Sequence, residues 1–343
     1  MATIRTTSNP EGQSDTLSKK LVIQIPCLNE AKTLPVALQD LPRAVPGFNV
    51  VEWLVIDDGS TDDTAEVARQ HGVHHVLQLE HNQGLARAFM AGIECALKLG
   101  ADVIVNTDAD NQYSASCIPE LVRPILEKRA LIVVGTRPVS EIEHFSPTKK
   151  LLQRLGSWVV KRISGTGVED APSGFRAIHR DAAIRLNVFN EYTYTLETII
   201  QAGRKGIPIT SVPVTVNPFL RPSRLISSIP TYITRSVLTI LRIFVIYKPL
   251  RFFMLLAALI AIPALFFIFR FIAFYAAGSG QGHIQSLVIA AGLLAVSGIL
   301  AIGGVLADLI ATNRLLLEDL RTRALRSEID IALALNKREQ SAE

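Results

Sequence analysis

The segment VIVNTDADNQ, residues 103–112, joins a short apolar run to two aspartates that are two positions apart. Similar apolar, β-branched runs occur at residues 21–26, 53–57, 76–79 and 131–135, and helical patterns lie between them. Strands that are apolar on both faces are buried between two helix layers. Because such strands alternate with helices here, the sequence predicts an α/β domain built on a mostly parallel sheet.

The composition changes along the chain and predicts its organisation. The first residues are polar and short of large apolar groups, which is typical of disorder. Two apolar runs near the C-terminus are long enough for a bilayer core of about 30 Å, which needs about 20 helical residues. We expect a disordered lead at 1–20, the α/β domain at 21–226, an interfacial amphipathic helix at 227–249, transmembrane helices at 250–277 and 284–310, and a C-terminal helix and tail at 312–343.

The overall composition favours a membrane protein over a soluble or nucleic-acid-binding one. Of the 343 residues, 49% are hydrophobic and 19% are charged, and no Asp or Glu occurs between Asn217 and Asp308. The formal net charge of +4 is concentrated beside the apolar runs, which favours membrane lipids as partners. A nucleic-acid site would need basic and aromatic residues interleaved in the α/β domain, and we expect none.

The distribution of basic residues predicts the topology. The loop between the two apolar runs, residues 278–283, carries no formal charge, whereas lysines and arginines flank the runs on their other sides. The positive-inside rule then places both termini and the α/β domain in the cytoplasm, in an integral protein of the inner (plasma) membrane. Three scattered cysteines fit a reducing compartment. The flanking cations are Arg221, Arg224, Arg235, Arg242, Lys248, Arg251, Arg314, Arg321, Arg323 and Arg326.

Carboxylates follow three of the predicted strands, in residues 26–30, 57–64 and 107–112. The carboxyl ends of parallel strands meet at one edge of the sheet, so these side chains are expected to share one cleft. Crowded carboxylates need a cation or a set of hydrogen-bond donors, and oxygen ligands suit Mg²⁺ or Mn²⁺, which completes its shell with water and a diphosphate. Phosphate-binding glycine loops are absent. We therefore predict that a metal is held by Asp108, Asp110 and Gln112.

The order and spacing of these motifs resembles family 2 inverting glycosyltransferases with the GT-A fold, a Rossmann-like, mostly parallel sheet. The similarity extends over about residues 21–224 and is greatest to the dolichol-phosphate mannose synthase type, whose bacterial members often end in two transmembrane helices. Processive synthases of the superfamily carry Q-x-x-R-W, which residues 153–158 do not match. The shared motifs are Pro26-x-x-Asn29-Glu30, Asp57-Asp58-Gly59-Ser60-x-Asp62, Asn82-x-Gly84, Asp108-Ala109-Asp110-x-Gln112, Gly135-Thr136-Arg137 and Ser173-Gly174-Phe175-Arg176.

The resemblance implies transfer of a single sugar from a UDP- or GDP-linked donor to a polyprenyl phosphate, such as undecaprenyl or dolichyl phosphate. A phosphate monoester is largely dianionic at neutral pH, so the attack needs no strong base. Asp170 is the candidate if a base or an acceptor-orienting carboxylate exists; a simple turn residue is the other interpretation. The resemblance places Pro26, Leu28, Glu30, Ile56 and Asp58 around the nucleoside, Asp108, Ala109, Asp110 and Gln112 at the metal and diphosphate, and Arg137, Lys150, Arg176, Arg221 and Arg224 near phosphate groups.

Two other functions stay open on the sequence alone: transfer to a neutral lipid hydroxyl, which would need a base, and a non-catalytic nucleotide-binding scaffold on the membrane. Glu197, on a helix, is either a buried functional carboxylate or a solvated one, and we favour the solvated interpretation. We expect the histidines at 71, 74 and 75 to lie on the surface. The second apolar run has a small-residue face suited to helix packing, which favours a homo-oligomer. That face consists of Ser297, Gly298, Ala301, Gly303 and Gly304.

Overall fold

The computed structural model describes residues 19–137, 157–188 apart from 159 and 163, 194–218, 238, 242, 245–278 and 283–340. In this part of the chain the strands form one seven-stranded sheet in the order β3-β2-β1-β4-β6-β5-β7. The strands are β1 (Lys20–Cys27), β2 (Val50–Asp57), β3 (His75–Gln78), β4 (Val103–Asn106), β5 (Ile132–Thr136), β6 (Arg176–His179) and β7 (Ile209–Pro213).

The sheet is mostly parallel, as the sequence predicts. Strands β3, β2, β1 and β4 run in one direction, and β5 pairs parallel with β7. Strand β6 alone runs antiparallel to both of its neighbours, β4 and β5. Because β6 is reversed, the chain that leads into it lies at the edge where the parallel strands end.

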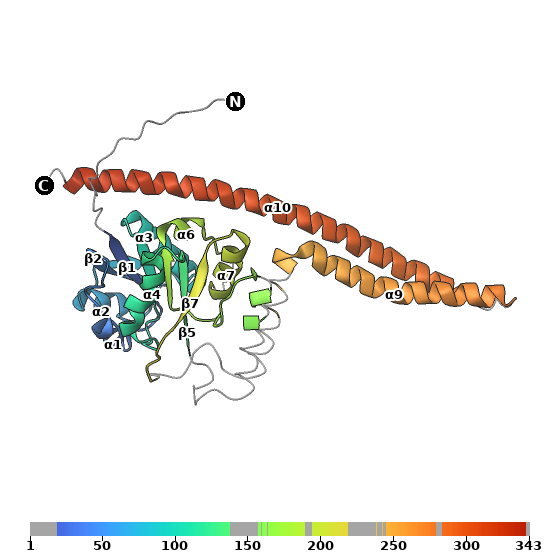
Figure 1. The fold of residues 1–343 in the computed structure, drawn as a ribbon, viewed down its shortest axis with the longest axis horizontal. Helices are drawn as coiled ribbons and strands as arrows, with labels where there is room; N and C mark the ends of the chain where they lie inside the picture. Colours follow the sequence, from blue (N-terminus) through green and yellow to red (C-terminus); the bar gives the residue numbers. More distant parts are fainter. Residues whose placement is uncertain are drawn as a thin grey trace, which may run out of the picture.

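Helices cover both faces of the sheet (Figure 1). The buried side chains of α1, α2 and α4 pack on one face together with Ile23 and Val55, and those of α3, α6 and α7 pack on the other with Val22 and Leu54. Neighbouring strand residues thus point to opposite cores, which is why these strands are apolar throughout. The helices are α1 (Leu34–Asp40), α2 (Thr64–Gln70), α3 (Leu85–Lys98), η1 (Ala115–Cys117), α4 (Ile118–Leu126), α6 (Arg180–Arg185) and α7 (Thr195–Arg204).

Helix α6 was not expected from the sequence, because six residues are too few to establish a helical period. Its start is fixed by a local contact instead. His179 Nδ1 accepts a hydrogen bond from the backbone N–H of Asp181, at 3.2 Å.

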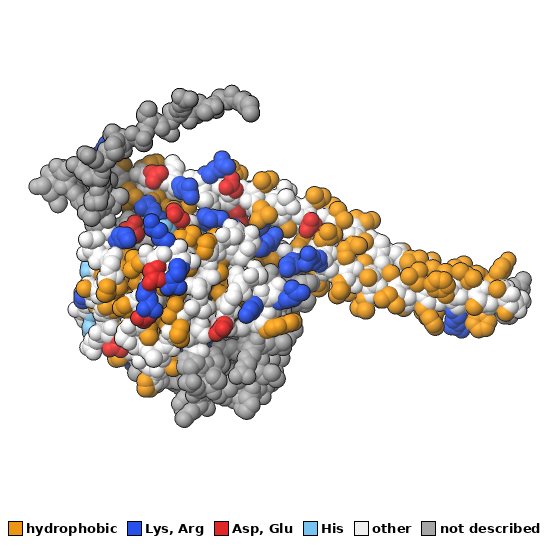
Figure 2. Space-filling model, viewed as in Figure 1, with side chains coloured by type: hydrophobic (Ala, Val, Ile, Leu, Met, Phe, Trp, Pro, Cys, Tyr) orange, Lys and Arg blue, Asp and Glu red, His pale blue; other side chains and the backbone are white. Residues whose placement is uncertain are grey.

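Two long helices follow the α/β domain, α9 (Pro249–Ala276) and α10 (Ile284–Gln340). They lie side by side as an arm that extends from the domain (Figure 1), and hydrophobic side chains cover the arm (Figure 2). Both helices are long and apolar enough to cross a membrane, judged by length and composition. The two expected transmembrane helices are thus present as candidate spans.

The expected break between the second span and a separate C-terminal helix is wrong. Helix α10 continues without interruption from Ile284 to Gln340. Residues 305–340 contain neither Gly nor Pro, and they are rich in Leu, Ala, Arg and Glu, which favour helix. A change from apolar to amphipathic composition therefore marks a change of surroundings and not the end of a helix.

Two other expected segments lie largely outside the described residues. These are the lead at 1–20, of which only Lys19 and Lys20 are described, and the interfacial helix at 227–249.

Candidate active site

The sheet order brings the three acidic strand ends together. Strand β1 lies between β2 and β4 and is parallel to both, so all three end at the same edge. Strand β6 begins at this edge, because its Arg176 pairs with Asn106 at the end of β4. The end of β5, next to Arg137, reaches it as well. The edge thus collects residues 27–30, 57–60, 107–112, 137 and 170–176.

Asp58, after β2, is held by the loop that starts α3. Its two carboxylate oxygens accept backbone hydrogen bonds from Gln83 at 2.8 Å and Gly84 at 2.9 Å. Gly59 adopts φ +71°, and a side-chain carbon there would lie 2.6 Å from the backbone nitrogen of Asn82. Only glycine allows this close approach. The Asn82-x-Gly84 motif therefore has a structural role: it fixes the Asp58 carboxylate.

Asp108 and Asp110 carry the unbalanced negative charge of the edge. Burial and the neighbouring charge of Asp110 raise the pKa of Asp108 to about 7, in spite of the opposing effect of Arg137 and Arg176. Asp110 accepts a hydrogen bond from the backbone N–H of Gln112, at 3.1 Å. Asn111, which lies between Asp110 and Gln112, has φ +54° and donates a hydrogen bond from its side-chain amide to Asp40, at 2.7 Å. These hydrogen bonds thus fix the turn that carries Asp108 and Asp110.

This donor set fits a divalent cation that is shared with a substrate. Among the described residues no group of three or more His, Cys, Asp or Glu is arranged to hold a metal by itself. Mg²⁺ and Mn²⁺ in phosphate chemistry need only one or two carboxylates, with water and phosphate oxygens as the other ligands. Asp108, Asp110 and the amide of Gln112 match that requirement, because burial and the charge of Asp110 disfavour the ionised Asp108 carboxylate and a nearby cation would stabilise it.

Arg137 and Asp170 form a buried, two-pronged ion pair. The Nε and Nη2 atoms of Arg137 donate to the two oxygens of Asp170, at 2.7 Å and 3.0 Å, and its backbone N–H donates to the same carboxylate at 3.2 Å. The side chains are 10% and 1% exposed. A carboxylate engaged on both oxygens by one guanidinium is well placed to orient that guanidinium.

Comparison with known proteins places the chain in a family. The sequence model described as "Glycosyl transferase family 2" matches residues 22–187. The undecaprenyl-phosphate mannosyltransferase of Micrococcus luteus is 31% identical over 201 residues, which are 56% of this chain and 81% of that protein. The chain belongs to glycosyl transferase family 2. The family that the motifs resemble is therefore confirmed, and the chain is a glycosyltransferase.

Two further proteins are similar to this family 2 glycosyltransferase. The polyprenol monophosphomannose synthase of Mycolicibacterium smegmatis is 24% identical over 209 residues, 58% of this chain and 77% of that protein. Glucosyl-3-phosphoglycerate synthase from Mycobacterium tuberculosis, in a crystal structure with Mn²⁺, UDP and phosphoglyceric acid, aligns with a TM-score of 0.50 at 20% identity. That alignment covers 65% of this chain and 78% of the other, and it shows a shared fold.

Arg176 of the glycosyltransferase does not lie where the resemblance implies. Its side chain is fully buried. The guanidinium donates to the backbone oxygens of Ser173 at 2.8 Å and Ala171 at 2.9 Å, and to the hydroxyl of Thr198. All three nitrogens are thus bound to protein groups, and Arg176 holds the 170–174 turn from beneath.

Ile56 does not have its expected role either, whereas the other residues expected around the nucleoside lie at the edge. Its side chain is fully buried in the core beside α3, so it does not line a nucleoside pocket. Glu30 is buried and accepts a hydrogen bond from the Thr33 hydroxyl. Leu28 is partly exposed, and Pro26 pairs with Ile56 in the β1–β2 register.

A polar network beneath the edge was missed by sequence reasoning. Asn106 donates to the backbone oxygen of Gly174 and to the hydroxyl of Tyr194, both at 2.9 Å. Tyr113 accepts from the N–H of Gly174 at 3.2 Å, and its ring stacks on Phe175. Asparagine at the end of the apolar β4 was a visible signal, because a buried amide needs partners. The tyrosines gave none.

The remaining expected residues divide into two groups. Lys150, Arg221 and Arg224 lie outside the described residues. Glu197 was expected to be solvated, and this is wrong: it is buried and forms an ion pair with Arg314, at 3.0 Å. Nothing near residue 197 in the sequence marks that partner, which is 117 positions away.

Proposed function

We propose that this glycosyltransferase moves a single sugar from a UDP- or GDP-linked donor to a polyprenyl phosphate at the membrane surface, with inversion at the anomeric carbon. One observation carries the proposal. The carboxylates of Asp108 and Asp110 share a sheet edge with the Arg137–Asp170 pair, in a domain joined directly to two apolar helices. The same chain thus combines anion-neutralising and cation-binding groups with a candidate membrane anchor.

The acidic side of the edge is assigned to the donor. Asp108, Asp110 and Gln112 would hold Mg²⁺ or Mn²⁺, with Ala109 in the same turn, and Pro26, Leu28, Glu30 and Asp58 would contact the nucleoside. When bound, the cation neutralises charge that develops on the leaving diphosphate. Glucosyl-3-phosphoglycerate synthase, which shares the fold, was crystallised with Mn²⁺ and UDP. The assignment here rests on the carboxylates of this chain.

The basic side of the edge is assigned to phosphate. Arg137 keeps Nη1 without a hydrogen-bond partner among the described residues, while its other nitrogens are fixed by Asp170. Asp170 is almost fully buried and has both oxygens engaged, which disfavours it as a general base. A phosphate acceptor needs no such base, whereas a neutral lipid hydroxyl does. The pair therefore favours the phosphate acceptor.

The names of relatives support the same acceptor class. They include an undecaprenyl-phosphate mannosyltransferase, a polyprenol monophosphomannose synthase and, in Methanococcus voltae, a UDP-N-acetylglucosamine–dolichyl-phosphate N-acetylglucosaminyltransferase. Their sugars differ, and only the last of these names states a nucleotide, so both UDP- and GDP-linked donors belong in any assay.

The decisive assay uses the purified full chain in detergent with Mg²⁺ or Mn²⁺ and a panel of UDP- and GDP-sugars. Undecaprenyl phosphate, undecaprenol and diacylglycerol are the acceptors compared. We expect nucleotide release and a glycosylated lipid with the phosphate alone, and loss of both in Asp110→Asn. Asp63→Asn is the matched control, since Asp63 is exposed and makes no side-chain cap at α2.

Each other result of this assay argues against the proposal. Glycosylation of diacylglycerol or undecaprenol would identify a neutral hydroxyl acceptor. Metal-dependent nucleotide binding without turnover of any donor would indicate a scaffold.

We further propose that the catalytic domain and both termini are cytoplasmic, in the inner (plasma) membrane. The uncharged loop at 278–283 and the basic flanks support this topology. A membrane-impermeant maleimide should label Ser279→Cys in intact spheroplasts, above the level of the parent chain. Asp63→Cys should be labelled only after lysis. The reverse pattern would overturn the topology.

A further inference from the structure

The last part of α10 packs on the catalytic domain. Leu325 and Ile329 are 6% and 1% exposed, and they belong to the same buried cluster as residues of α3, α6 and α7. Leu333 packs against that cluster too. Figure 1 shows α10 running back from the tip of the apolar arm and across the domain. One continuous helix therefore connects the candidate membrane span to the outer helix layer.

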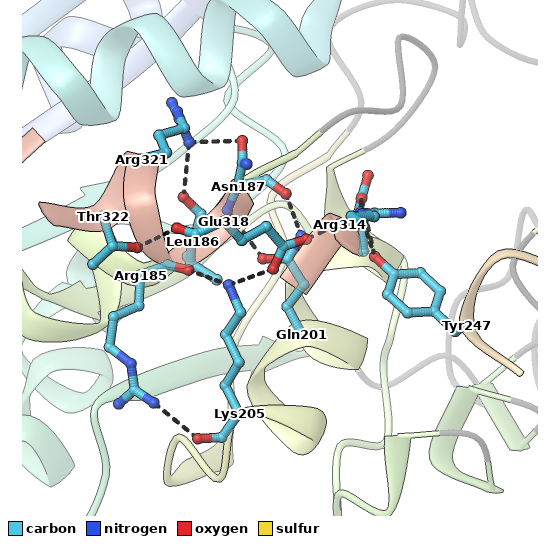
Figure 3. Close-up of polar contacts among 11 residues, drawn as sticks. Arg185, Leu186, Asn187, Gln201, Lys205, Tyr247, Arg314, Glu318, Arg321 and Thr322 are labelled. Carbon is cyan, nitrogen blue, oxygen red and sulfur yellow. Dashed lines mark hydrogen bonds and ion pairs between the residues drawn. The ribbon is translucent and has the colours of Figure 1, made fainter. Parts of the chain in front are cut away.

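Ion pairs and hydrogen bonds fix the seat of α10 (Figure 3). Glu318 is 5% exposed and binds Lys205 at 2.9 Å and Arg314 at 3.0 Å. Arg321 donates to the side chain of Asn187 at 2.6 Å. Because the Glu318 carboxylate is buried, the loss of either cation would be costly, which favours this one arrangement.

The pair between Arg314 and Glu197 attaches this seat to α7. Arg314 Nη2 lies 3.0 Å from Glu197 Oε1, which also accepts a hydrogen bond from the hydroxyl of Tyr247 at 3.0 Å. The Glu197 side chain is 8% exposed and that of Arg314 is 24% exposed. Glu197 therefore receives a positive counter-charge from α10 and a hydrogen bond from the chain just before α9.

Other residues of the α7 segment contact the groups that support the active site. Tyr194, at its N-cap, binds Asn106, and its hydroxyl lies 2.9 Å from the point where a side chain on Gly174 would begin. Thr198 accepts from Arg176, which holds the 170–174 turn. Glu197 lies in sequence between these two contacts. Helix α7 and its N-cap thus contact α10 through Glu197. Through Tyr194 and Thr198 they contact the residues that hold the turns of Asp108 and Asp170.

We propose that α7 makes the geometry of the donor site depend on the seat of α10, and that Arg314–Glu197 is the positioning pair that transmits this dependence. The site would be fully ordered only when the helix that leaves the membrane is docked on the domain. The inference uses the proposed function only in taking Asp108 as part of the donor site.

Hydrogen exchange tests the proposal without any turnover. In the full chain in detergent, Arg314→Gln should speed exchange of the amides at 170–176 by about fivefold or more. Arg314→Lys, which keeps the charge, should stay near the parent rate. Glu328→Gln is the matched control, because its ion pair with Lys98 of α3 is exposed at the surface and does not involve α7.

The outcomes separate coupling from general loosening. Faster exchange at 312–325 with an unchanged rate at 170–176 would overturn the proposal, as would an equal effect of Glu328→Gln. The affinity for UDP and GDP in the presence of Mn²⁺ is a second measurement. Arg314→Gln should lower this affinity by about fivefold. If transfer to lipid phosphate fails in the parent chain while the exchange result holds, the proposed function falls and the coupling stands.

Discussion

Both carboxylate oxygens of Asp108 lie 3.1 Å from the position that a side-chain carbon on Gly174 would occupy. The Tyr194 hydroxyl lies 2.9 Å from the same point. Gly174→Ala must therefore push the Asp108 carboxylate or the tyrosine away from its place. We expect kcat/KM for the donor to fall by about tenfold or more, which corresponds to about 1.4 kcal/mol of lost transition-state stabilisation. Nucleotide-release kinetics measure this loss.

The control for that substitution is Gly167→Ala. A side-chain carbon at Gly167 would meet no atom within 4 Å of the described chain. Its kcat/KM should match the parent, and both variants should keep the parent melting temperature to within a few degrees. Equal loss in the two variants would contradict a specific role of the Gly174–Asp108 contact.

The Arg137–Asp170 pair predicts strong coupling in a double-mutant cycle. Asp170→Asn leaves a buried guanidinium without its counter-charge, and Arg137→Ala leaves a buried carboxylate. Each should lower kcat/KM, and the double variant should lose far less than the product of the single losses, with a coupling energy of about 1–3 kcal/mol. Multiplicative losses would mean that Asp170 acts independently, for example as a base on the acceptor.

The order of motifs allowed the sheet edge to be predicted from the sequence, because buried parallel strands reveal themselves as apolar runs. Asp58, Asp108 and Asp110 follow such runs and do lie at that edge. The position of Arg176 could not be predicted this way. An arginine in such a motif can bind a ligand or donate to backbone carbonyls. Only the fold shows that the guanidinium of Arg176 donates to the backbone oxygens of Ser173 and Ala171.

The seat of α10 was beyond sequence reasoning for a different reason. The pairing of Arg314 with Glu197 joins residues 117 positions apart, and no local pattern encodes such a contact. The amphipathic stretch after the second span predicts a solvated or subunit-packing helix, whereas its apolar residues Leu325 and Ile329 pack on the catalytic domain of the same chain.

Glu52 predicts how stability depends on pH. Its carboxylate binds His75 at 2.8 Å and Lys20 at 2.7 Å, and these contacts lower its pKa from 4.5 to about 2 against the effect of burial. The unfolded chain therefore binds more protons between these two values. Stability from this group is complete above pH 4.5 and is lost as the pH falls to about 2. With the carboxylate 19% exposed, we expect a contribution of about 1–2 kcal/mol.

Thermal unfolding in detergent between about pH 2 and about pH 6 would measure that contribution, because this range covers the pKa of Glu52 in both the folded and the unfolded chain. Glu52→Gln should flatten the acid limb of the curve. Glu66→Gln is the control, since Glu66 pairs with Arg69 at the surface with 58% exposure. A parent curve that Glu52→Gln leaves unchanged would show that the pair adds nothing to stability.

Gly304 marks the contact between the two membrane helices. A side-chain carbon there would lie 2.8 Å from Cβ of Phe253 on α9, and nearby Ser297 donates to the backbone oxygen of Ala257 at 2.9 Å. Small residues allow this close packing. Gly304→Leu should force α9 and α10 apart and cost about 1–3 kcal/mol, seen as a lower unfolding temperature of the arm in detergent.

Gly298 provides both the control and a test of oligomerisation. A side-chain carbon at Gly298 would meet nothing within 4 Å in the described chain, so Gly298→Leu should leave the α9–α10 contact intact. The small-residue face favours a homo-oligomer, and Gly298 is open to a second copy whereas Gly304 contacts Phe253. Light scattering should then show a smaller particle for Gly298→Leu at unchanged unfolding temperature. An unchanged particle size would rule out an oligomer that packs through this glycine.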